Sequence, residues 1–150
     1  MTPIPRTALL LGLAGLIPFL WGAASQLSPG LAEVGTATAG PRFVGPYVSL
    51  AYGTVILSFM SGVLWGFATR ATGSAAATGY ALSVLPALWA FFMVGGGPTA
   101  AALSLMAGFA GLLVLDGLFW RWGLAPPWWM RLRGLLTAVV VVCLAVPALL

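Results

Sequence analysis

The sequence predicts an all-α membrane protein, a polytopic bundle of about five transmembrane helices that forms one domain over residues 1–150. Of these residues 61% are hydrophobic and only 5% are charged, whereas soluble domains carry roughly 25% charged residues. The apolar residues gather in runs close to the ~20 residues that cross the hydrocarbon core of a bilayer. Lipid offers the backbone no hydrogen-bond partners, so each span must be a helix or a barrel strand. These runs lack the alternation of barrel strands.

The first predicted span covers residues 7–27. A Ser-Pro-Gly sequence at 28–30 ends it, because proline and glycine interrupt helices. Residues 1–25 resemble a signal peptide, with Arg6 before an apolar stretch and small residues at the end. We interpret them as a retained span. Residues 28–46, rich in Gly, Ala, Thr and Pro, are predicted to form a loop.

Four further apolar runs follow, with breaks between them that glycine, proline and arginine mark. The predicted spans cover residues 47–69, 75–94, 99–120 and 134–150. The Gly-Gly-Gly-Pro sequence at 95–98 separates the third from the fourth, since glycine permits tight turns and proline bars a continuing helix. Pro18 and Pro86 lie inside predicted spans, and each is expected to kink its helix.

The arginines predict the orientation of the bundle, because cytoplasmic loops of membrane proteins carry an excess of basic residues. A cytoplasmic N-terminus leaves only Arg42 outside. The remaining arginines then share the cytoplasmic side: Arg6, Arg70, Arg121, Arg131 and Arg133. The C-terminus is accordingly predicted to be periplasmic. Because the arginines flank apolar runs and form no basic face, nucleic acid is not an expected partner.

Asp116 is the one acid inside a predicted span, and ionisable residues in spans are costly and often functional. It lies about one turn from the cytoplasmic end of its span, on the side where Arg131 and Arg133 begin the next span. We expect a structural ion pair at the membrane interface between Asp116 and one of these two arginines. A role in binding a proton, an ion or a ligand is the alternative.

Small residues recur every four positions in three of the spans. In the second span they are Ser58, Gly62 and Gly66, which a helix places along one stripe. Small stripes let helix backbones approach closely in lipid. Packing inside the bundle is the simpler interpretation, and a docking face for another membrane subunit is the alternative.

The sequence lacks the residues that common metal, haem and catalytic sites require. The chain has no His and two acids, so histidine-ligated haem and the usual zinc or di-iron sites are not expected. Cys143, the one cysteine, lies in an apolar run and is interpreted as a packing residue. We expect neither an enzyme nor a bound cofactor or metal.

The motif Tyr52-Gly53, Ile56-Leu57-Ser58-Phe59, Gly62 and Trp65-Gly66 resembles the central motif of the domain of unknown function 3429 family. The resemblance continues through Pro86 to Trp89, Asp116, and Pro127 to Thr137. It implies a small multi-span protein of bacterial inner or mitochondrial inner membranes, such as the mitochondrial transmembrane protein 69, and supplies no activity. Leu64 stands where the family often has His, so any role of that His would be absent. Trp129 replaces a more usual Tyr.

Two functions therefore stand as hypotheses for a multi-pass protein of the bacterial inner membrane, with membrane lipid as its surroundings. The first is a non-catalytic accessory, assembly or scaffold subunit of a larger complex of the respiratory or photosynthetic type. Its small-residue helix faces would bind a membrane-protein partner. The second is a small carrier or binder of a lipophilic ligand such as a quinone or lipid, in a pocket shaped by kinked spans near Asp116.

Overall fold

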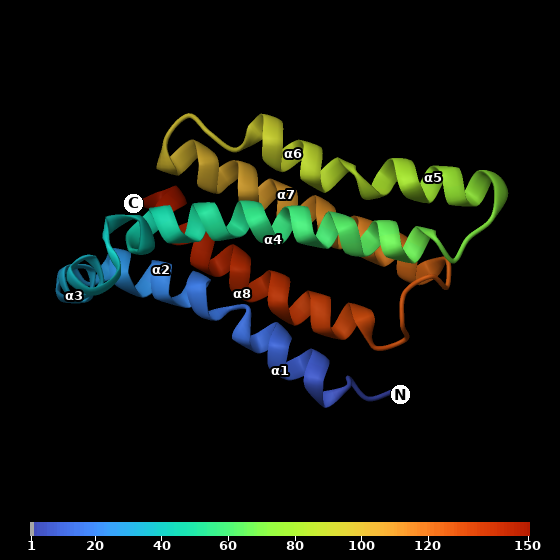
Figure 1. The fold of residues 1–150 in the computed structure, drawn as a ribbon, viewed down its shortest axis with the longest axis horizontal. Helices are drawn as coiled ribbons and strands as arrows, with labels where there is room; N and C mark the ends of the chain where they lie inside the picture. Colours follow the sequence, from blue (N-terminus) through green and yellow to red (C-terminus); the bar gives the residue numbers. More distant parts are fainter. Residues whose placement is uncertain (1) are drawn as a thin grey trace.

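The computed structural model describes residues 2–150, and this part of the chain contains helices and their connections only. Five segments are long and apolar enough to cross a membrane, which confirms the predicted fold class. The helices are α1 (Arg6–Ala14), α2 (Ile17–Leu27), α3 (Pro29–Ala39), the short 3-10 helix η1 (Pro41–Phe43), α4 (Gly45–Ala68), α5 (Gly73–Ser83), α6 (Leu85–Met93), α7 (Pro98–Arg121) and α8 (Trp129–Leu149). The two ends of the chain lie toward opposite ends of the bundle (Figure 1).

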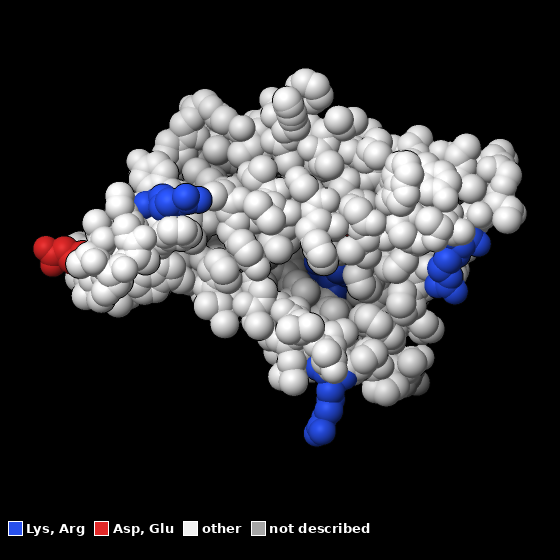
Figure 2. Space-filling view, in the orientation of Figure 1, with Lys and Arg blue, Asp and Glu red and all other residues white. Residues whose placement is uncertain are grey.

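Helix α4 lies at the centre of the bundle and packs against α2, α5, α6 and α7, while α8 packs chiefly on α7 and α2. Most side chains that fill the core are apolar, and the largest of them are phenylalanines and leucines. Those with at most 1% exposure include Phe19, Leu57, Leu64, Leu105, Phe109, Leu112, Phe119 and Leu144. Much of the visible outer surface carries no charge (Figure 2), as a hydrocarbon solvent requires.

The first span is broken into α1 and α2 at Gly15 and Leu16, just before Pro18. Pro18 lacks an N–H, and its ring would clash with the carbonyl of Ala14 in a continuous helix. The break changes the direction of the chain. Helix α2 packs against both α4 and α8, whereas α1 packs against α8 and diverges from α4 (Figure 1).

The third span is broken in the same way, between α5 and α6 and just before Pro86. Here a side chain of α4 enters the helical hydrogen-bond ladder. The Ser61 hydroxyl donates to the carbonyl of Ser83 and accepts from the N–H of Ala87 at 3.2 Å. These are the two backbone groups that would pair in an unbroken helix. Ser61 therefore satisfies the polar groups that the proline break exposes.

The prediction of a loop over residues 28–46 is wrong, because helix α3 and η1 occupy most of it. Ser28 caps α3 by accepting from the N–H of Leu31 at 3.4 Å, and Pro29 takes the first turn, where no N–H is needed. Gly40, at φ +97°, ends it. Figure 1 shows α3 end-on and thus across the bundle, the arrangement of a helix that lies along a membrane surface.

The fifth span begins at Trp129, before the predicted start at residue 134. Two arginines lie in its first turns. Because charged residues normally lie outside a span, the sequence placed the start of the span after them. Arg133 is buried with only 5% exposure. Its burial requires a partner inside the bundle, and that partner belongs to the candidate site.

Candidate functional site

Asp116 and Arg133 form a salt bridge between α7 and α8. The Nε of Arg133 donates to Oδ2 of Asp116 at 2.8 Å, and the exposed fractions of the two side chains are 6% and 0%. The indole N–H of Trp129 donates to Oδ1 of the same carboxylate at 2.9 Å. Both carboxylate oxygens thus have a partner, as a buried charge requires.

Arg131, the other arginine expected near Asp116, makes a different contact. Its guanidinium donates to the carbonyl of Thr2 and so holds the N-terminal segment against the start of α8. Arg70 makes a similar contact by donating to the carbonyl of Leu124 at 2.9 Å. These contacts bring the N-terminal segment, the α4–α5 turn and the α7–α8 connection together at one end of the bundle.

The burial of Asp116 differs from the interfacial location that its place in the sequence predicts. Although it lies only five residues before the end of α7, none of its surface is exposed. Trp129, which donates to the carboxylate, packs edge-on against Phe67 of α4 at 5.1 Å between ring centroids. Aromatic rings from α4 and α8 therefore lie beside the buried carboxylate.

Two buried polar atoms near the salt bridge have no hydrogen-bond partner in the described chain. They are Nη2 of Arg133 and Oγ1 of Thr137, one helical turn apart on the same face of α8. A buried polar group without a partner costs about 1–3 kcal/mol, and more if it is charged. Such groups in a folded protein need an explanation, and a binding site for a polar group of another molecule is one.

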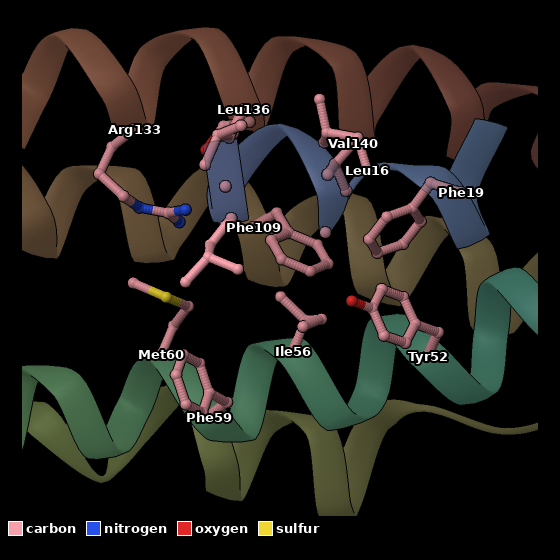
Figure 3. A pocket seen from close by; sticks show the side chains of 14 residues that line it. Leu16, Phe19, Tyr52, Ile56, Phe59, Met60, Phe109, Arg133, Leu136 and Val140 are labelled. Carbon is pink, nitrogen blue, oxygen red and sulfur yellow. The ribbon is translucent and has the colours of Figure 1, made fainter. Parts of the chain in front are cut away.

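Both side chains line an apolar groove of about 290 Å³. The walls come from α1, α2, α4, α7 and α8 and from the break in the first span. They comprise Leu11, Gly12, Gly15, Leu16, Phe19, Tyr52, Ile56, Phe59, Met60, Phe109, Arg133, Leu136, Thr137 and Val140. Figure 3 shows the guanidinium of Arg133 projecting into this space toward Met60 and Phe109, with the Tyr52 hydroxyl facing it from farther along. In Figure 2 a basic side chain is visible at the bottom of a hollow in the surface.

The break in the first span opens the groove, because α1 turns away from α4 at Gly15. The rim is exposed and apolar, with 69% of Leu11 and 64% of Phe59 accessible. The groove therefore has a polar inner end at α8 and an apolar mouth on a hydrocarbon-facing side. Ligand pockets are typically about 300–1,000 Å³, so this volume fits the head and first chain segment of a lipid-like molecule.

Two other cavities lack this combination of a polar inner end with unpartnered atoms and an apolar mouth. One, between α6 and α7 beside Pro86, has Trp89 as its main polar residue. The Trp89 indole N–H already donates to the carbonyl of Ser104 at 2.6 Å. The other, near η1, contains Arg42, whose guanidinium lies over the ring of Phe43 at 4.8 Å. Neither is lined by the buried unpartnered atoms of Arg133 and Thr137.

The stripe of Ser58, Gly62 and Gly66 on α4 faces outward, and all three residues are exposed. A Cβ built on Gly62 or Gly66 would meet nothing within 4 Å. Small residues of the other spans behave differently. A Cβ at Gly79 would lie 3.0 Å from Ala68, and one at Gly108 would lie 2.7 Å from Leu57. The stripe on α4 is thus available to another molecule, whereas those of α5 and α7 pack inside the bundle.

The family is decided by a comparison of the sequence with known protein families. The profile of DUF3429, described as a protein of unknown function, matches residues 4–149. The chain belongs to this family. The match confirms the resemblance drawn from the central motif, and it covers every helix described above.

A relative of known sequence agrees with this membership. Transmembrane protein 69 of Xenopus tropicalis is 36% identical over 146 residues, which cover 91% of this chain and 51% of the relative. The chain thus spans about half the length of that protein. No solved structure matches the chain.

Sequence reasoning identified Asp116 and Arg133 but missed the groove beside them. Thr137 follows Arg133 by one turn, so the sequence does carry a signal for a two-residue polar patch on one face of α8. The lining residues of α1 and α4 carry no such signal, because an apolar residue that faces a groove looks the same as one that faces lipid.

Proposed function

We propose that this DUF3429 protein binds a lipophilic molecule in the groove between α1, α2, α4 and α8. The observation that carries the proposal is the pair of buried, unpartnered polar atoms, Arg133 Nη2 and Thr137 Oγ1, at the inner end of an apolar cavity. The expected location is the bacterial inner membrane, where such molecules are dissolved in the bilayer.

The chemistry of the two polar groups defines the head of the ligand. Arginine donates hydrogen bonds only, and a threonine hydroxyl both donates and accepts. The head must therefore offer at least one acceptor, as the carbonyl of a quinone or a lipid ester does. The walls of Phe19, Ile56, Phe109 and Val140 then fit a hydrocarbon portion.

The apolar mouth supports entry from the membrane. Leu11 and Phe59 line the opening and are exposed, so a chain attached to the head can extend into the bilayer. A ligand held in this way exchanges with the lipid phase without crossing water. This property suits a carrier or a binding protein for a membrane-dissolved compound.

Co-purification tests the proposal. The protein is purified in mild detergent, and small molecules extracted from it are quantified by mass spectrometry for wild type and for Ile56→Trp. Ile56 points into the groove (Figure 3), so the larger indole fills it. Val55→Trp is the matched control, because Val55 is 61% exposed on the outer side of the same helix.

The proposal predicts that at least one lipophilic compound is retained by wild type and by Val55→Trp and is lost from Ile56→Trp. An extract that is the same for all three proteins would contradict it. A folding defect in Ile56→Trp would appear as a changed elution volume or thermal stability, so Thr137→Val provides a second, nearly isosteric change. It is expected to lower the retained amount.

A second function, that of an accessory, assembly or scaffold subunit of a larger inner-membrane complex, is favoured by the outward stripe of Ser58, Gly62 and Gly66. Close approach of a partner helix to this stripe needs the small residues. Gly62→Leu should abolish co-purification of a partner. Gly111→Leu on α7, where a Cβ also meets nothing within 4 Å, should leave it intact. Recovery of a lone protein in several mild detergents would contradict this function.

A further inference from the structure

The polar end of the groove is lined by one cation, and one anion lies buried behind it. Among the residues that line the cavity, Arg133 is the only one with a charged side chain. Its charge is opposed by Asp116, which is fully buried behind it and bonded to Nε at 2.8 Å. The end of the groove thus presents hydrogen-bond donors without an uncompensated positive charge.

From this geometry we infer that the groove selects a ligand with an uncharged, carbonyl-type head and rejects a carboxylate or phosphate head of the same size. The inference rests on the proposed function and names the ligand class. It follows from how the guanidinium is divided. Asp116 accepts from Nε, while the guanidinium itself projects into the cavity (Figure 3), with Nη2 unpartnered and Thr137 Oγ1 one turn along.

A neutral carbonyl suits this arrangement. Its oxygen accepts from the guanidinium of Arg133, and the Thr137 hydroxyl, one turn along the same helix face, can donate to it or to a second acceptor of the head. Binding then removes two unsatisfied polar groups and adds no charge. The buried salt bridge stays intact, with Trp129 still bonded to Oδ1 of Asp116.

An anionic head does not suit it. A carboxylate at Nη2 would share one guanidinium with Asp116, leaving two negative charges and one positive charge in a low-dielectric interior. No other cation of the described chain lines the groove. Arg131 donates to the Thr2 carbonyl and Arg70 to the Leu124 carbonyl, and neither lines the groove.

Methyl oleate and oleate form a matched pair of probes, because they share one acyl chain and differ in the charge of the head. Each is supplied in isotope-labelled form to the full-length protein immobilised in mild detergent, at a pH of about 9 to keep the fatty acid ionised. Retention by Ile56→Trp provides the background. Wild type is expected to bind methyl oleate at least about tenfold more tightly than oleate, a factor that corresponds to about 1.4 kcal/mol.

Asp116→Asn changes the charge of the site and keeps its shape. The amide oxygen can still accept from Arg133, although the amide nitrogen loses the bond from Trp129. The end of the groove now carries an uncompensated positive charge. This variant should shift the preference toward oleate by about tenfold or more relative to wild type. Thr137→Val, which removes one polar group and no charge, should weaken methyl oleate binding and leave the charge preference in place.

The outcomes separate the two proposals. If wild type retains neither probe above the Ile56→Trp background, the groove is not a ligand site, and both the proposed function and the inference fail. If wild type binds both probes equally, or oleate more tightly, the proposed function stands and the inference is overturned. The wild-type ratio alone decides the matter should Asp116→Asn fail to fold.

Discussion

Nε of Arg133 lies 2.8 Å from Oδ2 of Asp116, so a single salt bridge joins α8 to α7 inside the bundle. The bond also sets the direction of the guanidinium. With Nε fixed against the carboxylate, the guanidinium projects into the groove (Figure 3), and its buried Nη2 has no partner. Arg133 therefore belongs both to the structural ion pair and to the candidate ligand site. The two roles that Asp116 suggests from sequence are compatible with each other.

Removal of the Asp116 carboxylate should destabilise the bundle strongly. Asp116→Ala leaves Arg133 buried without its counter-ion, and breaking a buried pair in this way costs about 3–5 kcal/mol. Thermal unfolding or SDS titration in a mild detergent measures the loss. Glu33→Ala is the control, because Glu33 is exposed on α3 and its removal should have little effect. Equal stability of the two variants would show that the salt bridge does not hold α7 and α8 together.

Gly108 is expected to be essential for the packing of α7. A Cβ there would lie 2.7 Å from Leu57 and 2.8 Å from Trp89, so Gly108→Ala must displace side chains of α4 and α6. Overpacking of this kind costs about 1–3 kcal/mol. Gly111→Ala on the same helix meets nothing within 4 Å, and it should keep or raise stability through the better helix propensity of alanine. The same unfolding assay compares the two variants, and a reversed order would mean that α7 packs differently.

The arginine distribution predicts which end of the bundle faces the cytoplasm. In a Cys143→Ser background, Thr38→Cys on α3 should react with a membrane-impermeant maleimide added to intact spheroplasts. Thr72→Cys, in the α4–α5 turn, should react only after lysis. Both positions are exposed, so accessibility within the protein does not limit the reaction. Reaction of Thr72→Cys alone in intact cells would invert the predicted topology.

Much of the fold follows from the sequence, because long apolar runs and their interruptions carry strong signals. Four of the five span boundaries agree within two residues at each end, and the start of α8 is the exception. That error has a physical cause. A hydropathy scale scores Arg131 and Arg133 alike. In the structure, however, Arg131 donates to the carbonyl of Thr2 near the N-terminus, and Arg133 is buried against Asp116.

The candidate site was predictable only in part. A lone acid in a span and two arginines at the next indicate a pair, but choosing between the arginines requires the rotation of α8 about its axis. The groove depends on how far α1 turns from α4 after the break near Gly15, which tertiary packing decides. The sequence of α3 likewise suggests a loop because it is rich in glycine, alanine, threonine and proline, whereas its caps at Ser28 and Gly40 define a helix.

The central claim is that Arg133 and Thr137 form the polar end of a ligand site, and cross-linking tests it most directly. A methyl oleate analogue with a diazirine next to the ester is photolysed with the purified protein, and modified peptides are located by mass spectrometry. Adducts are expected to concentrate on α8 around Arg133 to Val140 and on α4 around Ile56 to Met60, and to be lost in Ile56→Trp. Adducts spread over lipid-exposed side chains such as Phe91 and Phe92, with no loss in that variant, would contradict it.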